Sequence, residues 1–229
     1  MYVCICCGAE VEKIYTQYSK EIINFQLCKI CGRIVDKYVE YDFTIVAIDL
    51  LVCKIEAYRH ILRNIEIPRL FHLLLLSCLL CGFLGWICTE NFDNFDVNII
   101  NATVNSDLYS SILLKTLVTA LSGFLLYSFG YIFGLNISVI GIVKLLVLTN
   151  LCSLIGLLMY PWKNILLDFL PYTSVYFSPI LTFVCTLPTT IPSFRALTNA
   201  SYTLSLIIPL ISCSLVFVIE SSVIKDRPF

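Results

Sequence analysis

Long apolar runs occupy most of the chain after residue 69. Four of them have the length of a membrane-crossing helix and cover residues 70–88, 112–134, 137–160 and 202–219. A bilayer core about 30 Å thick needs about 20 residues of helix to cross it. The strands of a membrane barrel would alternate apolar and polar side chains, and these runs show no such alternation. The pattern therefore predicts four membrane-spanning helices.

A fifth apolar segment, at residues 175–191, is interrupted by prolines. Pro179 and Pro188 lie inside it, and Pro192 lies just beyond its end. Proline removes a helix hydrogen bond, which is tolerated at membrane depth only where protein or water satisfies the backbone. The segment fits a kinked span, a re-entrant segment or an interfacial one, so the sequence predicts four spans, or five if this one crosses.

The first 69 residues follow a different pattern. Residues 10–27 read as short strands, whereas apolar side chains recur at helical spacing between residues 43 and 62. The second stretch predicts an amphipathic helix with a basic end. Such a helix can lie on the cytosolic leaflet of a membrane, or it can pack on the rest of the protein. The sequence leaves both interpretations open.

Composition separates these two parts of the chain. Hydrophobic residues make up 59% of it and charged residues only 14%, against about 25% charged residues in soluble domains. Residues 1–69 nevertheless carry nine Lys or Arg and nine Asp or Glu, out of 31 charges in all. We expect three regions: residues 1–35, a linker at 36–69, and a membrane body at 70–229. The balanced charge of the head and the net charge of −1 give no basic face for a nucleic acid.

Four of the 12 cysteines form two C-x-x-C pairs near the N-terminus: Cys4, Cys7, Cys28 and Cys31. Each pair presents two thiolates from one tight turn, and two such turns complete the tetrahedral shell that a structural zinc ion (Zn2+) prefers. Gly8 and Gly32 follow the second cysteine of each pair, where glycine relieves the steric limit on a tight turn. The pattern predicts a zinc ribbon, with Cys6 left over.

Other uses of cysteine fit less well. Two disulfides would need an oxidising compartment, and a redox C-x-x-C pair occurs singly within a βαβ pattern that this sequence lacks. Four thiolates leave no open position for water, so catalytic zinc is not expected. Seven further cysteines lie in or beside apolar runs, where they pack as small hydrophobic residues: Cys53, Cys78, Cys81, Cys88, Cys152, Cys185 and Cys213.

The distribution of basic residues predicts the orientation in the membrane. Lys54, Arg59, Arg63 and Arg69 precede the first span, whereas the loop at residues 89–111 has four acidic residues and no Lys or Arg. The positive-inside rule then places the head in the cytosol and this loop, with its Asn101 sequon, in the lumen. A basic tail at residues 225–227 favours the cytosol and hence an even number of spans. We expect a mainly α integral membrane protein with four, or five, transmembrane helices and a small N-terminal cytosolic zinc ribbon.

The ionisable residues of the membrane body give little indication of a catalytic or transport function. Lys115 and Lys144 lie close enough to span ends for their side chains to reach the interface, and Asp168 lies in a proline-containing loop. A lipid-modifying transferase would need a base or nucleophile near the interface. The two histidines, His60 and His72, have no acidic partner at H-x4-D spacing, so no catalytic constellation is expected and a structural role for His60 is favoured.

A series of motifs then makes the head recognisable. After the two cysteine pairs come Asp36-Lys37-Tyr38-Val39-Glu40-Tyr41-Asp42, Ile48-Asp49-Leu50-Leu51 and Ala57-Tyr58-Arg59-His60. This series resembles the homology domain of the Arv family, the ACAT-related proteins required for viability, and it covers residues 1–65. One departure is Ile55-Glu56, where the family pattern leads us to expect a proline.

The resemblance implies a location and a process. It implies a multi-pass protein of the endoplasmic reticulum membrane, and also of the Golgi membrane, that takes part in lipid homeostasis. The processes it implies are sterol transport and distribution, sphingolipid metabolism and glycosylphosphatidylinositol anchor assembly, by a lipid transporter or scaffold. The implied partners are these membrane lipids and the lipid-synthesis enzymes of the same membrane. A membrane-bound lipid-modifying transferase is the alternative.

Overall fold

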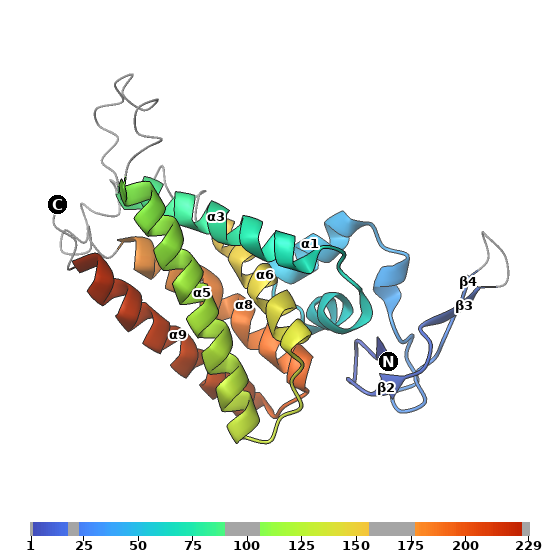
Figure 1. The fold of residues 1–229 in the computed structure, drawn as a ribbon. Helices are drawn as coiled ribbons and strands as arrows, with labels where there is room; N and C mark the ends of the chain where they lie inside the picture. The colour runs from blue at the N-terminus through green and yellow to red at the C-terminus, as the bar shows by residue number, and fades with distance from the viewer. Residues whose placement is uncertain (1, 18–22, 90–105, 156–176, 226–229) are drawn as a thin grey trace.

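The computed structural model describes residues 2–17, 23–89, 106–155 and 177–225. In these ranges the membrane body consists of five apolar helices packed side by side (Figure 1). They are α3 (Leu70–Thr89), α5 (Ser106–Ile132), α6 (Val139–Ser153), α8 (Phe177–Thr198) and α9 (Tyr202–Lys225). The mainly helical membrane body that the apolar runs predict is therefore confirmed.

The helices differ in length. Three of them are long and apolar enough to cross a bilayer, over Leu108–Ile132, Pro179–Thr198 and Tyr202–Val223. Leu70–Trp86 and Val139–Ser153 form shorter apolar helices. Large apolar side chains such as Leu117, Phe124 and Tyr131 are exposed on the outside of the bundle. In water this exposure would be costly, whereas in a bilayer these side chains meet lipid.

The proline-containing segment forms a helix. Helix α8 contains Pro188 and Pro192 in its interior, so of the three interpretations the structure supports the helical one. Since residue 192 has no N–H, the carbonyl of Pro188 loses its helical donor, and the thiol of Cys53 lies 3.5 Å from that oxygen as a replacement donor. The hydroxyls of Thr190 and Ser193 bond the carbonyls of Thr186 and Thr189 in the same turns. The Cys53 thiol thus supplies a donor to one of the carbonyls that the prolines leave without a helical partner.

The five helices run alternately up and down, so the end of α9 lies at the end of the bundle away from the head (Figure 1). The sequence predicts four apolar helices, or five, and the structure has five because the proline-containing segment forms α8. If all five cross the membrane, α9 ends on the side opposite the head, whereas the basic tail predicts the same side as the head. The predicted sequon at Asn101, the acidic loop around it, Asp168 and residues 226–227 lie outside the described residues.

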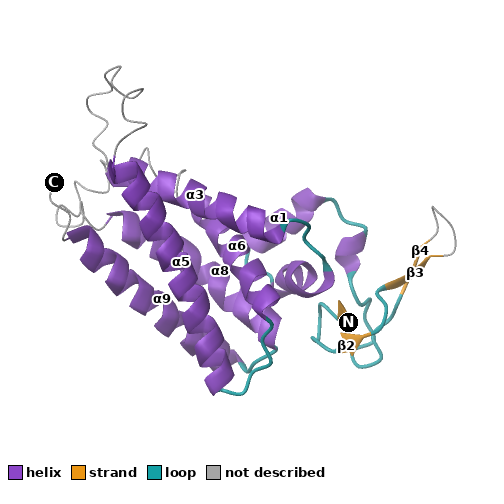
Figure 2. Cartoon of the chain, viewed as in Figure 1, coloured by secondary structure: helices purple, strands orange, loops and turns teal. Residues whose placement is uncertain are grey.

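All strands of the described ranges belong to the head (Figure 2). β1 (Tyr2–Val3) pairs antiparallel with β2 (Glu10–Val11), and β3 (Tyr15–Gln17) pairs antiparallel with β4 (Ile23–Phe25). The short strands expected between the cysteine pairs are therefore present. Two very small sheets leave little apolar core, and the buried residues that join them are few: Cys4, Ile14, Cys28 and Val35.

The linker is broken into several short helices instead of one. A 3-10 turn, η1 (Lys37–Val39), is followed by α1 (Phe43–Leu51), α2 (Ile55–Arg59) and a π turn, η2 (His60–Asn64). The single helix predicted for residues 43–62 is wrong, because Cys53 adopts a left-handed backbone (φ 60°) that ends α1. Helix α2 packs on the rest of the protein, because it contacts α8 and buries Ala57 and Tyr58 fully. Phe43, Ile48 and Leu51 of α1 stay exposed instead, which fits a helix that lies on a membrane leaflet.

Candidate metal centre

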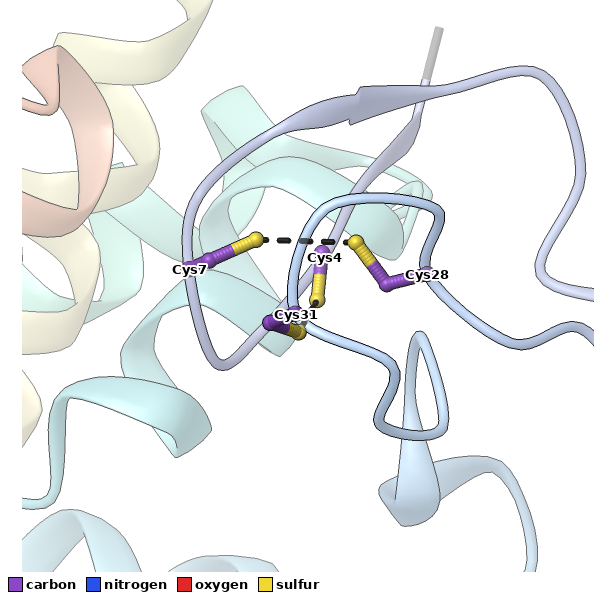
Figure 3. Close-up of side chains that lie close together, drawn as sticks. All are labelled: Cys4, Cys7, Cys28 and Cys31. Atoms are coloured by element: carbon purple, nitrogen blue, oxygen red, sulfur yellow. Dashed lines mark hydrogen bonds between the residues drawn. The ribbon is translucent and has the colours of Figure 1, made fainter.

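The four predicted cysteines come together at one point of the head. One sulfur from each of Cys4, Cys7, Cys28 and Cys31 lies within 4.8 Å of all the others, and the side chains converge (Figure 3). The sulfurs of Cys4 and Cys31 are 3.8 Å apart and those of Cys7 and Cys28 are 3.6 Å apart. A tetrahedral zinc ion with bonds of about 2.3 Å would hold its sulfurs about 3.8 Å apart. The donor set and its spacing therefore fit zinc.

Two similar turns position these thiols. In the first, the Gly8 N–H donates to the carbonyl of Cys4, and in the second the Gly32 N–H donates to the carbonyl of Cys28. Both N–O distances are 2.9 Å. Both glycines have a left-handed backbone, with φ of +81° and +69°, a conformation that costs glycine least. The structure thus confirms the reason for the glycine after each pair.

The pKa values of the thiols determine how metal binding depends on pH. Burial raises the pKa of the Cys4 thiol to about 12 and also raises the pKa of Cys7. The backbone N–H groups of Cys31 and Ile30 instead lower the pKa of Cys28 to about 6. Without metal, Cys4 and Cys7 therefore hold their protons more tightly than an ordinary thiol does. A divalent cation must displace them, so metal binding releases protons and weakens as the pH falls.

Cys6 lies outside the cluster, as the spacing predicts. Its sulfur accepts a hydrogen bond from the Arg33 guanidinium at 3.2 Å. The carbonyls of Ile5 and Cys6 accept from Nη1 of Arg59 at 3.0 and 2.7 Å. The backbone of the first cysteine turn is therefore fixed by an arginine that comes from α2.

A buried carboxylate organises the region behind the cysteines. Asp36, which is fully buried, accepts hydrogen bonds from the Tyr38 N–H, from Nδ1 of His60 at 2.7 Å and from the amide of Asn64 at 2.7 Å. The Asn64 side chain also bonds the backbone N–H and carbonyl of Val3 in β1. The network ties the π turn to the head and gives His60 a structural partner. The sequence missed Asn64, which carries no motif.

The head is also attached to the bundle. The Asn199 amide, in the turn between α8 and α9, donates to the carbonyl of Gly8 at 2.9 Å. Nη1 of Arg63 donates to the carbonyl of Leu197 at 3.0 Å. Arg59 and Arg63, for which the sequence predicted no role in the head, thus join the metal centre to the end of α8.

Lys115 does not reach an interface, which corrects the prediction. It is buried between helices, where its ammonium group contacts the carboxylate of Glu220 and donates to the Thr182 hydroxyl at 2.8 Å. Glu220 lies 105 residues away in α9, so the partner is invisible to sequence spacing. Lys144 does lie at a helix end, and donates to the carbonyls of Leu62 and Ile65. His72 is exposed on α3.

Comparison with known proteins points to one family. The model of the Arv1-like family matches residues 3–210. Protein ARV1 of Mus musculus is 42% identical over 87 residues, which are 38% of this chain and 32% of that protein. The Homo sapiens protein is 42% identical over 86 residues (37% and 31%), and the Saccharomyces cerevisiae protein is 45% identical over 62 residues (27% and 19%). The matched stretch spans about a third of the mouse and human relatives or less. No solved structure matches the chain.

Proposed function

Because the chain belongs to the Arv1-like family, with a match that extends from the cysteine head into the last apolar helix, we propose that it maintains the lipid composition of the endoplasmic reticulum membrane. The processes are sterol transport and distribution, sphingolipid metabolism and the assembly of glycosylphosphatidylinositol anchors. The family match is the observation that carries this proposal. The protein acts on these lipids as a transporter or as a scaffold for lipid-synthesis enzymes of the same membrane, with a Golgi pool as a second location.

The polar groups of the described head support a non-enzymatic role. The cysteines form a closed four-thiol cluster that holds a structural zinc ion, and such a site has no open position for water. His60 is buried, and its Nδ1 bonds the Asp36 carboxylate, which also accepts from the Asn64 amide. A histidine in this position fixes the linker. The head then serves to hold α2 and the end of α8 in place through Arg59, Arg63 and Asn199.

The His60→Asn variant tests this role. An asparagine amide can donate to Asp36 as Nδ1 of histidine does, but it cannot transfer protons, so we expect His60→Asn and His72→Ala to complement a null strain. His60→Ala leaves the buried Asp36 short of one donor and should lower the free energy of unfolding by about 1–3 kcal/mol. Sterol distribution and the accumulation of anchor precursors are the readouts. A correctly inserted His60→Asn protein with null-level function would instead support the lipid-modifying transferase.

The orientation of the chain makes a second prediction. With a cytosolic head and five passes, a tag before residue 1 should be cut by protease added to sealed microsomes. Tags at residue 98 and after residue 229 should both be protected until detergent opens the vesicles. Two termini with the same accessibility would refute five passes, and a protected N-terminal tag would invert the orientation.

A further inference from the structure

A cavity with a mainly apolar lining and a set of polar side chains lies inside the helix bundle, in the half away from the head. All five bundle helices line it, and it offers about 80 Å³ of space, enough for about six water-sized groups. Lys115, Thr119 and Ser122 of α5 face it, as do Thr182, Thr186 and Thr190 of α8. These residues recur every three or four positions, which is the spacing of one helix face.

The outer face of the same helix has the opposite character. Leu113, Leu117 and Phe124 of α5 are between 60% and 66% exposed on the lipid side, whereas Lys115 and Thr119 are less than 9% exposed. Polar groups at membrane depth are costly and mark a functional site by default. Their alignment on inward faces of several helices therefore points to a binding site within the bundle.

The hydrogen bonds of the wall determine what it can recognise. The hydroxyls of Ser122, Thr190 and Ser212 donate to carbonyls of their own helices, at 2.8, 2.6 and 2.9 Å. A hydroxyl that donates to its own backbone still has lone pairs that accept. The Lys115 ammonium already donates to Glu220 and Thr182. These hydroxyls thus offer acceptors to the cavity, and they fit a ligand that brings donors, as hydroxyl groups do.

The charges and the apolar lining of the cavity restrict the class of ligand further. Lys115 and Glu220 neutralise each other, so a charged ligand would leave one charge uncompensated in a medium of low dielectric constant. The same cavity has apolar lining residues, among them Leu84, Val118 and Phe217. An uncharged polyol joined to an apolar chain fits both the polar side chains and the apolar lining of the cavity.

We propose that this cavity binds the uncharged polyol head group of a membrane lipid, of which a glycerol group with one acyl chain is the simplest example. The inference deepens the proposed lipid function and rests on it for the source of the ligand, because a free polyol has the same hydroxyl chemistry. The hydroxyls of the wall accept from the hydroxyl groups of the ligand, and the apolar lining takes the first part of the chain.

Photolabelling of the full chain in nanodiscs tests the proposal. The probe is a monoacylglycerol with a photoactivatable acyl chain, compared with a fatty acid and an alkyl trimethylammonium that carry the same chain. We expect the monoacylglycerol to label the cavity helices, the two charged probes to label them far less, and excess free glycerol to leave the labelling unchanged. Labelling by all three probes alike, or displacement by free glycerol, would overturn the assignment to a lipid polyol.

A matched pair of variants on α5 locates the site. Thr119→Val removes a cavity oxygen, whereas Thr116→Val makes the same change on the exposed face. One hydrogen bond of about 1 kcal/mol corresponds to about a fivefold loss of labelling, expected for Thr119→Val alone. Equal labelling of both variants would refute the cavity as the site.

The labelling result and the cellular result can fail separately. A wild-type chain that complements the null strain but does not label would refute this site and leave the proposed function standing. A chain that labels as expected while its loss leaves cellular lipids unchanged would refute the proposed function and leave the site standing.

Discussion

Cys28→Ser should remove the metal from the head and unfold it. A tetrahedral site with three thiolates binds zinc far more weakly, and structural zinc contributes an apparent free energy of about 10–16 kcal/mol in small zinc domains. The described head has only a few buried residues that could replace this contribution. Metal analysis of the purified full chain should give one zinc for the wild type and none for the variant. Limited proteolysis should cut within residues 1–35 of the variant only.

Cys6→Ser is the matched control for this prediction. Its sulfur lies outside the cluster and bonds Arg33, so the variant should keep the zinc and its resistance to protease. Equal damage from both variants, or a folded head without metal, would refute the assignment of the ligands.

Acid should have the same effect as Cys28→Ser in the wild type. Zinc requires deprotonated thiols, and burial raises the pKa of Cys4 and Cys7 while backbone N–H groups lower that of Cys28. As the pH falls, protons therefore compete with zinc first at Cys4 and Cys7. Zinc release measured against pH should increase towards acid, and the metal should bind more tightly as the pH rises.

Lys115→Met should strongly destabilise the bundle. The substitution leaves the buried carboxylate of Glu220 without its cation, and removing one partner of a buried pair costs about 3–5 kcal/mol. The Lys115 ammonium also bonds Thr182, so the variant loses a contact that joins α5, α8 and α9. Unfolding of the detergent-solubilised chain by increasing denaturant should show this loss as a lower midpoint.

The double variant Lys115→Met/Glu220→Leu should recover much of the lost stability, because two apolar side chains replace the pair without leaving a charge. Lys144→Met serves as the control: its ammonium bonds carbonyls at a helix end, where a carbonyl can turn to water. A Lys115→Met chain as stable as the double variant would show that the unpaired Glu220 carboxylate does not destabilise the bundle, which would refute this prediction.

The residues of the metal centre could be predicted because its geometry is local. Each cysteine turn closes within a few residues through a bond from Gly8 or Gly32 to the first cysteine of the pair. Both the ligand type and the left-handed glycine are therefore visible in sequence spacing. The apolar helices are visible for a similar reason, since the length of a run against the bilayer thickness needs no knowledge of neighbours.

The contacts between distant segments could not be predicted in this way. Asp36 contacts His60 and Asn64, and Lys115 contacts Glu220, only after the helices have packed. Helical spacing predicts which face of a helix a residue occupies, but it does not predict which residue lies opposite. The break at Cys53 and the helix through Pro188 also meet in a long-range contact, because the Cys53 thiol supplies a donor to the Pro188 carbonyl. The sequence by itself thus determined the apolar helices and the four cysteines that come together. The tertiary structure decided the arrangement of the five bundle helices, the burial of His60 beside Asp36 and the pairing of Lys115 with Glu220, since each depends on partners brought together by packing.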